Sequence, residues 1–182
     1  MIANYQGSFV ALITPFLNNE IDEDKFQKFI DWQISEGTNG LVPCGTTGES
    51  PTLTHEEHKR VIDLTIEVAN NRVPVMAGTG SNSTEEAISL TRYAKRAGAD
   101  SALIVMPYYN KPTQEGMYEH FKAINDSVDL PIFIYNIPGR SVVDMSIDTM
   151  SKLSRLTNII GTKDASNDPI RPTLLRNELQ GR

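Results

Sequence analysis

The chain has 182 residues, of which 39% are hydrophobic and 22% are charged, a balance typical of a globular domain that excludes a disordered or fibrous protein. Its formal net charge is −6 and no basic run with interleaved aromatic residues occurs, so a nucleic-acid partner is not expected. The length suffices for one sizeable core, and we expect a single domain over residues 1–182.

The N-terminal segment, Met1 to Gly7, lacks the basic start and the apolar run of a secretion signal. No segment approaches the roughly twenty apolar residues that a membrane-spanning helix needs, so no membrane partner is expected. Cys44 is the only cysteine, which excludes an intrachain disulfide and argues against a cysteine-based metal site. We therefore expect a cytoplasmic protein without a metal, in which Cys44 is a small buried residue at a strand end.

Short apolar runs rich in β-forming residues alternate with segments of helical periodicity along the whole chain. The first helix is expected over residues 24–36, where Phe26, Ile30 and Ile34 share one face and Gly37 follows as a cap. The strands are expected over residues 9–14, 40–44, 73–77, 102–106, 132–135 and 159–162.

Two further helices are marked by capping boxes, in which a hydroxyl and a glutamate satisfy exposed backbone N–H groups at the helix start. These boxes lie at residues 54–57 and 83–86. Later helices are expected over residues 114–127 and 147–156, and a loop with a partial helix over residues 168–179.

Strand and helix thus alternate six times with a period of about 30 residues, the length of a βαβ unit. Such units form a parallel sheet with right-handed crossovers, so the predicted fold class is α/β. The periodicity fits an open doubly wound sheet and a closed eightfold barrel equally well. In both architectures the ligand site lies beyond the carboxyl ends of the strands.

The segment after the second predicted strand is Gly45-Thr46-Thr47-Gly48-Glu49-Ser50, whose backbone N–H groups and hydroxyls suit a carboxylate or a proton relay. It matches neither the P-loop nor the dinucleotide pattern, and Gly78-Thr79-Gly80 lacks the third glycine of the latter. A nucleotide-binding βαβ module is therefore the weaker alternative.

Three later strand ends carry groups that suit carbonyl chemistry. Proline-bounded turns hold Tyr108 and Tyr109 after the fourth strand, and the fifth strand ends on Tyr135 with Arg140 nearby. The sixth strand ends on Lys163, where we expect the side-chain stem to cross apolar surroundings. A desolvated lysine loses its proton near neutral pH and can attack a carbonyl to form an imine.

Four segments together, in this order and spacing, resemble the dihydrodipicolinate synthase family. They are residues 45–50, 107–110, 135–140 and 161–165. The likeness runs from about Gly7 to Ser166 and covers only the front part of the family's pattern.

The resemblance implies a (β/α)8 TIM barrel with about six βα units present in this chain, which is apparently truncated at its C-terminus. It also implies a lyase that condenses pyruvate with L-aspartate 4-semialdehyde, in the biosynthesis of diaminopimelate and lysine. In the family no dissociable cofactor or metal is used, and the assembly is a homotetramer.

By motif position, the resemblance makes Lys163 the residue that forms the imine with pyruvate. Tyr135 would exchange protons beside that imine, and Thr46 and Tyr109 would relay them to solvent, Tyr109 from a neighbouring subunit. Thr47 would hold the pyruvate carboxylate. Arg140 would pair with the carboxylate of the aldehyde substrate.

Sialic-acid lyases of the same superfamily carry a serine at the position of Thr46 and lack the arginine at the position of Arg140, so the synthase is favoured over N-acetylneuraminate lyase. The resemblance also implies an allosteric lysine site in some relatives. Its residues would be Ser50, His55, His58, Asn82, Glu86 and Tyr108.

Each of these six residues also has a structural alternative. Glu86 can complete a helix cap, and His55 and His58 lie on an acidic helix start where solvated histidines are common. The tail after Lys163 supplies no further strand in the predicted pattern, so an inactive partial barrel is the alternative to an imine-forming lyase.

Overall fold

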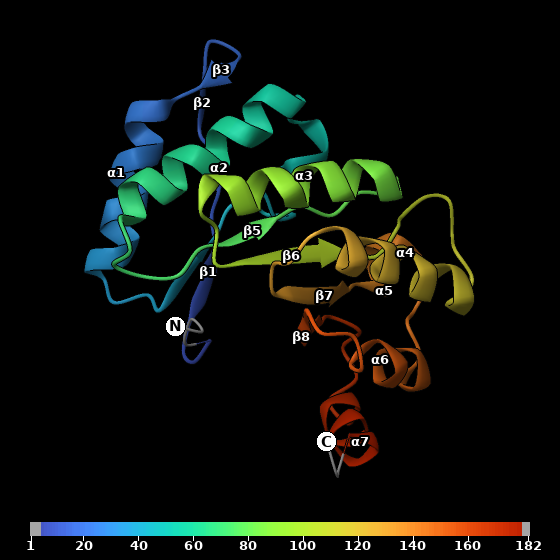
Figure 1. The fold of residues 1–182 in the computed structure, drawn as a ribbon. Helices are drawn as coiled ribbons and strands as arrows, with labels where there is room; N and C mark the ends of the chain where they lie inside the picture. Colours follow the sequence, from blue (N-terminus) through green and yellow to red (C-terminus); the bar gives the residue numbers. More distant parts are fainter. Residues whose placement is uncertain (1–4, 180–182) are drawn as a thin grey trace. The chain divides into compact units, whose positions relative to one another are not determined.

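The structure of the chain is a computed structural model that describes residues 5–179 (Figure 1). Residues 1–4, part of the N-terminal segment predicted to lack a secretion signal, and residues 180–182 lie outside the described residues. The chain forms two compact units. Unit 1 contains the described residues up to Thr79 together with Arg92–Leu103, and unit 2 contains Gly80–Thr91 and the described residues from Ile104 onward.

Unit 1 is built on parallel strands that follow one another along the chain. Strand β1 pairs with β4 in parallel, and an isolated bridge joins Leu41 of β4 to Val75, which precedes β5. Strand β5 in turn pairs with the first residues of β6. The elements that lie wholly in unit 1 are β1 (Phe9–Ala11), β2 (Phe16–Leu17), β3 (Glu20–Ile21), α1 (Glu23–Ser35), β4 (Gly40–Val42), η1 (Ser50–Thr52), α2 (His55–Ala69) and β5 (Met76–Gly78).

Two elements have residues in both units: α3 (Thr84–Ala97) and β6 (Ser101–Val105). In unit 2 the N–H of Met106, directly after β6, donates to the carbonyl oxygen of Tyr135 on β7, and β7 pairs with β8 in parallel. The remaining elements of unit 2 are α4 (Gln114–Ser127), β7 (Ile132–Asn136), α5 (Pro138–Ser141), α6 (Ile147–Leu153), β8 (Ile159–Asp164) and α7 (Arg171–Glu178).

The apolar faces expected from helical periodicity form the cores of the units. In unit 1, Phe26 and Ile30 of α1 are fully buried and pack with Leu41 of β4 and with Val61 and Leu64 of α2. Helices α1 and α2 lie side by side on this core (Figure 1). In unit 2 the largest fully buried side chains come from α4, from β7, and from β6 and the residue after it; they are Ile104, Met106, Met117, Phe121, Ile124 and Ile132.

The two predicted capping boxes differ in outcome. At 83–86 the N–H of Glu86 donates to the hydroxyl of Ser83 at 3.4 Å, but the N–H of Ser83 donates to Ser81, whose hydroxyl also donates to the Glu86 carboxylate. Thr54 caps α2 with both hydrogen bonds of a capping box to Glu57, as predicted. Thr113 and Ser146 cap α4 and α6 by accepting from the N–H groups of Gly116 and Thr149. Helix α4 has the predicted bounds, whereas α6 ends at Leu153, three residues before the predicted end.

Several short elements were absent from the sequence-based prediction. Strands β2 and β3 form a hairpin whose two turn residues, Asn18 and Asn19, both have positive φ, the conformation of a type I′ turn. Helix α5 follows β7, and η1 follows the glycine-rich segment. The predicted strand at 73–77 begins only at Met76, since Pro74 has no N–H to donate to a ladder.

Cys44 is buried and follows β4, as predicted for a residue at a strand end. Burial raises the pKa of its thiol. Strand β5 comes close to this point, because a Cβ atom on Gly78 would collide with the carbonyl oxygen of Cys44. Glycine is therefore required at position 78 by the close approach of the two backbone segments.

His120 is a buried ionisable residue on α4. One ring nitrogen, Nδ1, lies 2.8 Å from the hydroxyl of Thr84, and within residues 5–179 the other, Nε2, is buried without a hydrogen-bond partner. The ring also meets Phe121 edge to face, with the ring centres 5.2 Å apart. Burial lowers the pKa of His120 from 6.5 to about 4.

Because the folded-state pKa of His120 is lowered, the unfolded state binds the extra proton between about pH 6.5 and pH 4, and stability is lost as the pH falls through that window. We expect the free energy of unfolding to fall by about 2 kcal/mol more in the wild type than in His120→Asn between pH 7 and pH 5. Urea titrations at both pH values measure this difference. The control is His55→Gln, because His55 is exposed on α2. An equal fall in the free energy of unfolding in the wild type and in His120→Asn would contradict the prediction.

Candidate active site

Lys163 and Tyr135 lie opposite each other near the carboxyl ends of β8 and β7. The parallel register pairs these two residues directly. The Lys163 Nζ atom lies over the tyrosine ring, 4.3 Å from its centre. Tyr135 is buried, with 7% of its surface exposed. The two side chains are therefore close enough to act on one bound molecule, the amine as a nucleophile and the phenol as a proton carrier.

The surroundings of Lys163 differ from the sequence-based prediction. We predicted that its stem crosses apolar surroundings, but the residue is exposed. The physical reason is the position of β8: among the described residues it pairs with β7 alone. The prediction of an apolar environment for Lys163 is wrong for this structure, while the predicted place of the lysine near a strand end beside Tyr135 is confirmed.

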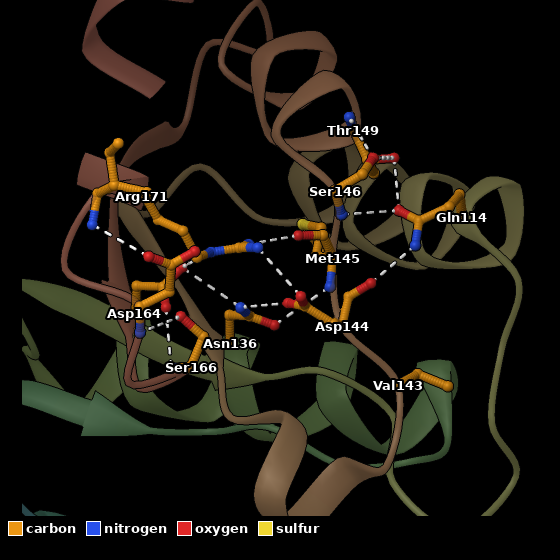
Figure 2. Close-up of polar contacts among 12 residues, drawn as sticks. Gln114, Asn136, Val143, Asp144, Met145, Ser146, Thr149, Asp164, Ser166 and Arg171 are labelled. Atoms are coloured by element: carbon orange, nitrogen blue, oxygen red, sulfur yellow. Dashed lines mark hydrogen bonds and ion pairs between the residues drawn. The ribbon is translucent and has the colours of Figure 1, made fainter. Parts of the chain in front are cut away.

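A polar network occupies the neighbouring positions of the same two strands (Figure 2). Asn136 and Asp164, the last residues of β7 and β8, are also register partners. The Nδ2 group of Asn136 donates to Asp144 at 2.8 Å and to Asp164 at 3.3 Å. Arg171, the first residue of α7, reaches both carboxylates. Because successive side chains of a strand point to opposite faces, this network lies on the face of the sheet opposite to Tyr135 and Lys163.

One guanidinium, that of Arg171, serves the two carboxylates of this network. Burial raises the pKa of Asp164, but hydrogen bonds from Ser166, Arg171 and Asn136 outweigh burial and hold that pKa below its ordinary value. The side chains of Arg171 and Asp164 are 11% and 14% exposed. Sequence reasoning missed this network, because Arg171 and Asp144 are 27 positions apart and no local pattern joins them.

Arg140 lies on α5, the short helix that follows β7. Its N–H donates to the carbonyl oxygen of Ile137, and the residue is exposed. Val142 directly after α5 has a φ of 68°, an unusual conformation for a β-branched residue. The helix thus turns the chain sharply and leaves the guanidinium of Arg140 open to solvent on unit 2.

Thr46 and Thr47 lie in the glycine-rich turn of unit 1, after β4. The turn is closed by hydrogen bonds from the N–H groups of Gly48 and Ser50 to the carbonyl oxygen of Gly45. The hydroxyl of Thr14, which follows β1, donates to the carbonyl oxygen of Gly48 at 2.8 Å and so holds the turn in place. Both threonines are exposed, so their hydroxyls are open to a ligand.

The two tyrosines after β6 have different surroundings. Tyr109 has a φ of 70° and is 87% exposed. A bulky residue in the left-handed region is uncommon, and here it directs a large ring away from unit 2. Tyr108 is half-buried, and both burial and the nearby charge of Glu86 raise its pKa.

The six residues of the predicted lysine site fall into two groups. Asn82, Glu86 and Tyr108 lie together in unit 2, where the carboxylate of Glu86 accepts from the hydroxyl of Ser81. The others are in unit 1; they are Ser50, His55 and His58. His55 is exposed, but His58 is 4% exposed and its Nε2 lies 2.8 Å from the carbonyl oxygen of Gly78. The alternative of a solvated histidine is therefore wrong for His58.

Within residues 5–179 no three His, Cys, Asp or Glu side chains gather as ligands for a metal ion. No helix in the same range has the length and apolar character to cross a membrane.

The α/β architecture predicted from the sequence is confirmed by parallel strands alternating with helices. The model of the dihydrodipicolinate synthetase family matches residues 4–180. The chain belongs to the dihydrodipicolinate synthetase family.

Among curated relatives, the 4-hydroxy-tetrahydrodipicolinate synthase of Rhodospirillum centenum is 69% identical over 175 residues, which are 96% of this chain and 60% of that protein. That of Bradyrhizobium diazoefficiens is 64% identical over 92% of this chain and 56% of the relative. This chain therefore spans about 60% of the length of the curated relatives it matches.

Among solved structures, the dihydrodipicolinate synthase of Acinetobacter baumannii in complex with pyruvate is 52% identical, with a TM-score of 0.95 over 98% of this chain and 62% of that one. This likeness confirms the barrel prediction as a fold assignment: the chain carries part of a (β/α)8 barrel. The extent of one domain over residues 1–182 stays a prediction.

Proposed function

We propose that this chain carries the imine-forming part of a lyase that condenses pyruvate with L-aspartate 4-semialdehyde to 4-hydroxy-tetrahydrodipicolinate, in the biosynthesis of diaminopimelate and lysine. The observation that carries the proposal is the Lys163–Tyr135 pair, with the amine 4.3 Å from the ring centre, in a chain of this family. The names of the relatives support the choice of reaction.

In the proposed reaction the Lys163 amine attacks the ketone carbon of pyruvate and water leaves, which forms a protonated imine. The imine draws electrons from the methyl group, so that a methyl proton is lost and the carbon becomes a nucleophile. That carbon then forms a bond to the aldehyde carbon of the second substrate, whose oxygen takes up a proton. The amino group of that substrate then displaces the Lys163 amine from the imine as the ring closes. No dissociable cofactor or metal takes part in this proposal.

Tyr135 is proposed to carry protons to and from the imine, with Thr46 and Tyr109 as further hydroxyls of the relay. Thr47 is proposed to bind the pyruvate carboxylate through its hydroxyl and N–H group. Arg140 is proposed to bind the carboxylate of the aldehyde substrate, since its exposed guanidinium can make a two-pronged contact.

We further propose a homotetramer in the cytoplasm. The exposure of Tyr109, at 87%, supports a role in which its ring enters the site of a neighbouring subunit. A lysine site at Ser50, His55, His58, Asn82, Glu86 and Tyr108 is a separate proposal. It is supported in unit 2, where Tyr108 lies beside Asn82 and Glu86.

The test is reductive trapping. The purified chain is incubated with pyruvate and borohydride, which converts an imine into a stable secondary amine, and the modified peptide is identified by mass spectrometry. We expect a pyruvate adduct confined to the peptide that contains Lys163. Lactate, which has the same carbon skeleton without a ketone, is the matched control and leaves no adduct.

Two alternatives predict other outcomes. An inactive partial barrel would be folded by circular dichroism yet give no adduct, while a full-length relative gives one. A pyruvate aldolase such as N-acetylneuraminate lyase would form the adduct but would not consume L-aspartate 4-semialdehyde. Stabilisation by a nucleotide would instead favour the βαβ nucleotide-binding alternative.

A further inference from the structure

Arg171 of α7 contacts two other segments of unit 2 through one side chain (Figure 2). Its Nε donates to Asp164 Oδ2 at 3.0 Å, its Nη1 to Asp144 Oδ2 at 3.0 Å, and its Nη2 to the carbonyl oxygen of Met145 at 2.6 Å. All three nitrogen atoms of the guanidinium are thus used. The side chains of Arg171 and Asp164 are 11% and 14% exposed, so the contact between them is largely screened from water, whereas Asp144 is 47% exposed.

Through Asn136 the network also includes β7, and it adjoins the residues proposed to react. Asp164 directly follows Lys163 on β8. Asn136, which directly follows Tyr135 on β7, links the two carboxylates and accepts from the N–H of Met145 through Oδ1. The segment with Asp144 and Met145 follows α5, the short helix that carries Arg140.

The network can therefore control the position of Lys163 relative to Tyr135 without contacting a substrate. Tyr135 and Lys163 point to the face of the sheet opposite to Asn136 and Asp164. A shift of β8 relative to β7 on one face moves the lysine relative to the tyrosine on the other by the same amount. A misplacement of about 1 Å between reacting groups costs on the order of 100-fold in rate.

We propose that Arg171 is a positioning residue that keeps Lys163 against Tyr135. On the opposite face of the sheet it binds Asp164 of β8 and the segment after α5, and Asn136 of β7 binds the same two carboxylates. The part that concerns imine formation rests on the function proposed above. The part that concerns the geometry of the Lys163–Tyr135 pair does not.

The shape of the arginine side chain matters as much as its charge. Its planar fork presents donors to two carboxylates and one carbonyl oxygen at once, whereas a lysine ammonium is a compact charge on a flexible stem. Arg171→Lys keeps the charge between Asp144 and Asp164 but cannot reproduce the three contacts. Arg171→Met removes both the charge and the fork.

The first experiment measures the pair itself. Because the Lys163 amine lies over the ring of Tyr135, the ring shields the adjacent ε-methylene group of Lys163, and its NMR signal in a lysine-labelled chain is expected upfield of the other lysines. Lys163→Arg assigns the signal. We expect this shift to be lost in Arg171→Met and reduced in Arg171→Lys, and kept in Arg176→Met, which alters an exposed arginine on the same helix.

The second experiment measures the rate constant for trapping pyruvate on Lys163 at saturating pyruvate, per folded molecule. We expect it to fall on the order of 100-fold in Arg171→Met, to stay low in Arg171→Lys, and to match the wild type in Arg176→Met. If Arg171 only stabilises the fold, replacing it lowers the urea midpoint of unfolding but leaves the trapping rate constant of the folded molecules unchanged.

The two proposals fail in different ways. If the wild type forms no adduct, the proposed function fails, and the NMR signal of Lys163 still decides the positioning role. A Lys163 signal that stays upfield in both Arg171 variants overturns the positioning role, as does a wild-type trapping rate in either folded variant.

Discussion

Replacing Lys163 by arginine is expected to abolish the pyruvate adduct. Arginine keeps a positive charge and a long stem at the end of β8, but its guanidinium stays protonated at any pH at which the protein is folded and cannot act as an amine nucleophile. No imine can then form, so trapping should drop to the level seen without borohydride. Mass spectrometry of the intact chain after incubation with pyruvate and borohydride measures the loss.

The control for this prediction is Lys152→Arg. Lys152 lies on α6 in the same unit, and its ammonium pairs with Asp148 at 2.8 Å on an exposed face. We expect this variant to form the adduct as the wild type does. An adduct that persists in Lys163→Arg and disappears in another lysine variant would show that a different amine is the nucleophile.

Replacing Tyr135 by phenylalanine is expected to slow imine formation by a factor of about 100 to 10,000, the range that a well-placed proton carrier contributes. The ring remains, so the packing of the buried side chain and the contact with the Lys163 ammonium are kept, and only the hydroxyl is lost. Rapid-quench trapping over a series of times measures the rate constant, and urea titration checks that the fold is retained.

Tyr118→Phe is the matched control for Tyr135→Phe. Tyr118 lies on α4, a helix that carries none of the proposed reacting groups. Its loss of a hydroxyl should leave the trapping rate within about twofold of the wild type. If Tyr135→Phe also forms the imine at the wild-type rate, Tyr135 has a packing role only, and the proton must be carried by another group.

Much of the fold could be predicted from the sequence. Hydrophobic periodicity located the six major strands and the principal helices, because apolar spacing records which residues of each element face the core. The capping box at Thr54 located the start of α2, since a side-chain oxygen there satisfies an exposed N–H group. The hairpin at 16–21 escaped prediction, because its strands have only two residues each and no period can be seen in them.

The candidate site was predicted in part. The position of Lys163 beside Tyr135 follows from a rule of parallel sheets, that the carboxyl ends of neighbouring strands meet at one edge. The degree of exposure of Lys163 did not follow, because exposure depends on what pairs with the far edge of β8. The burial of His58 could not be predicted either, because its hydrogen-bonding partner is the carbonyl group of Gly78, 20 residues away in the chain.

The sequence by itself thus determined the α/β class, the order of strands and the chemical types of the groups at their ends. Only the tertiary structure revealed that Arg171 binds both Asp144 and Asp164, on the face of the sheet opposite to Lys163 and Tyr135. It also revealed that His120 is buried, with one ring nitrogen lacking a hydrogen-bond partner within residues 5–179. The physical reason is that periodicity and capping are short-range properties that the chain repeats locally. A buried contact between residues far apart in the chain depends on how several elements pack at once.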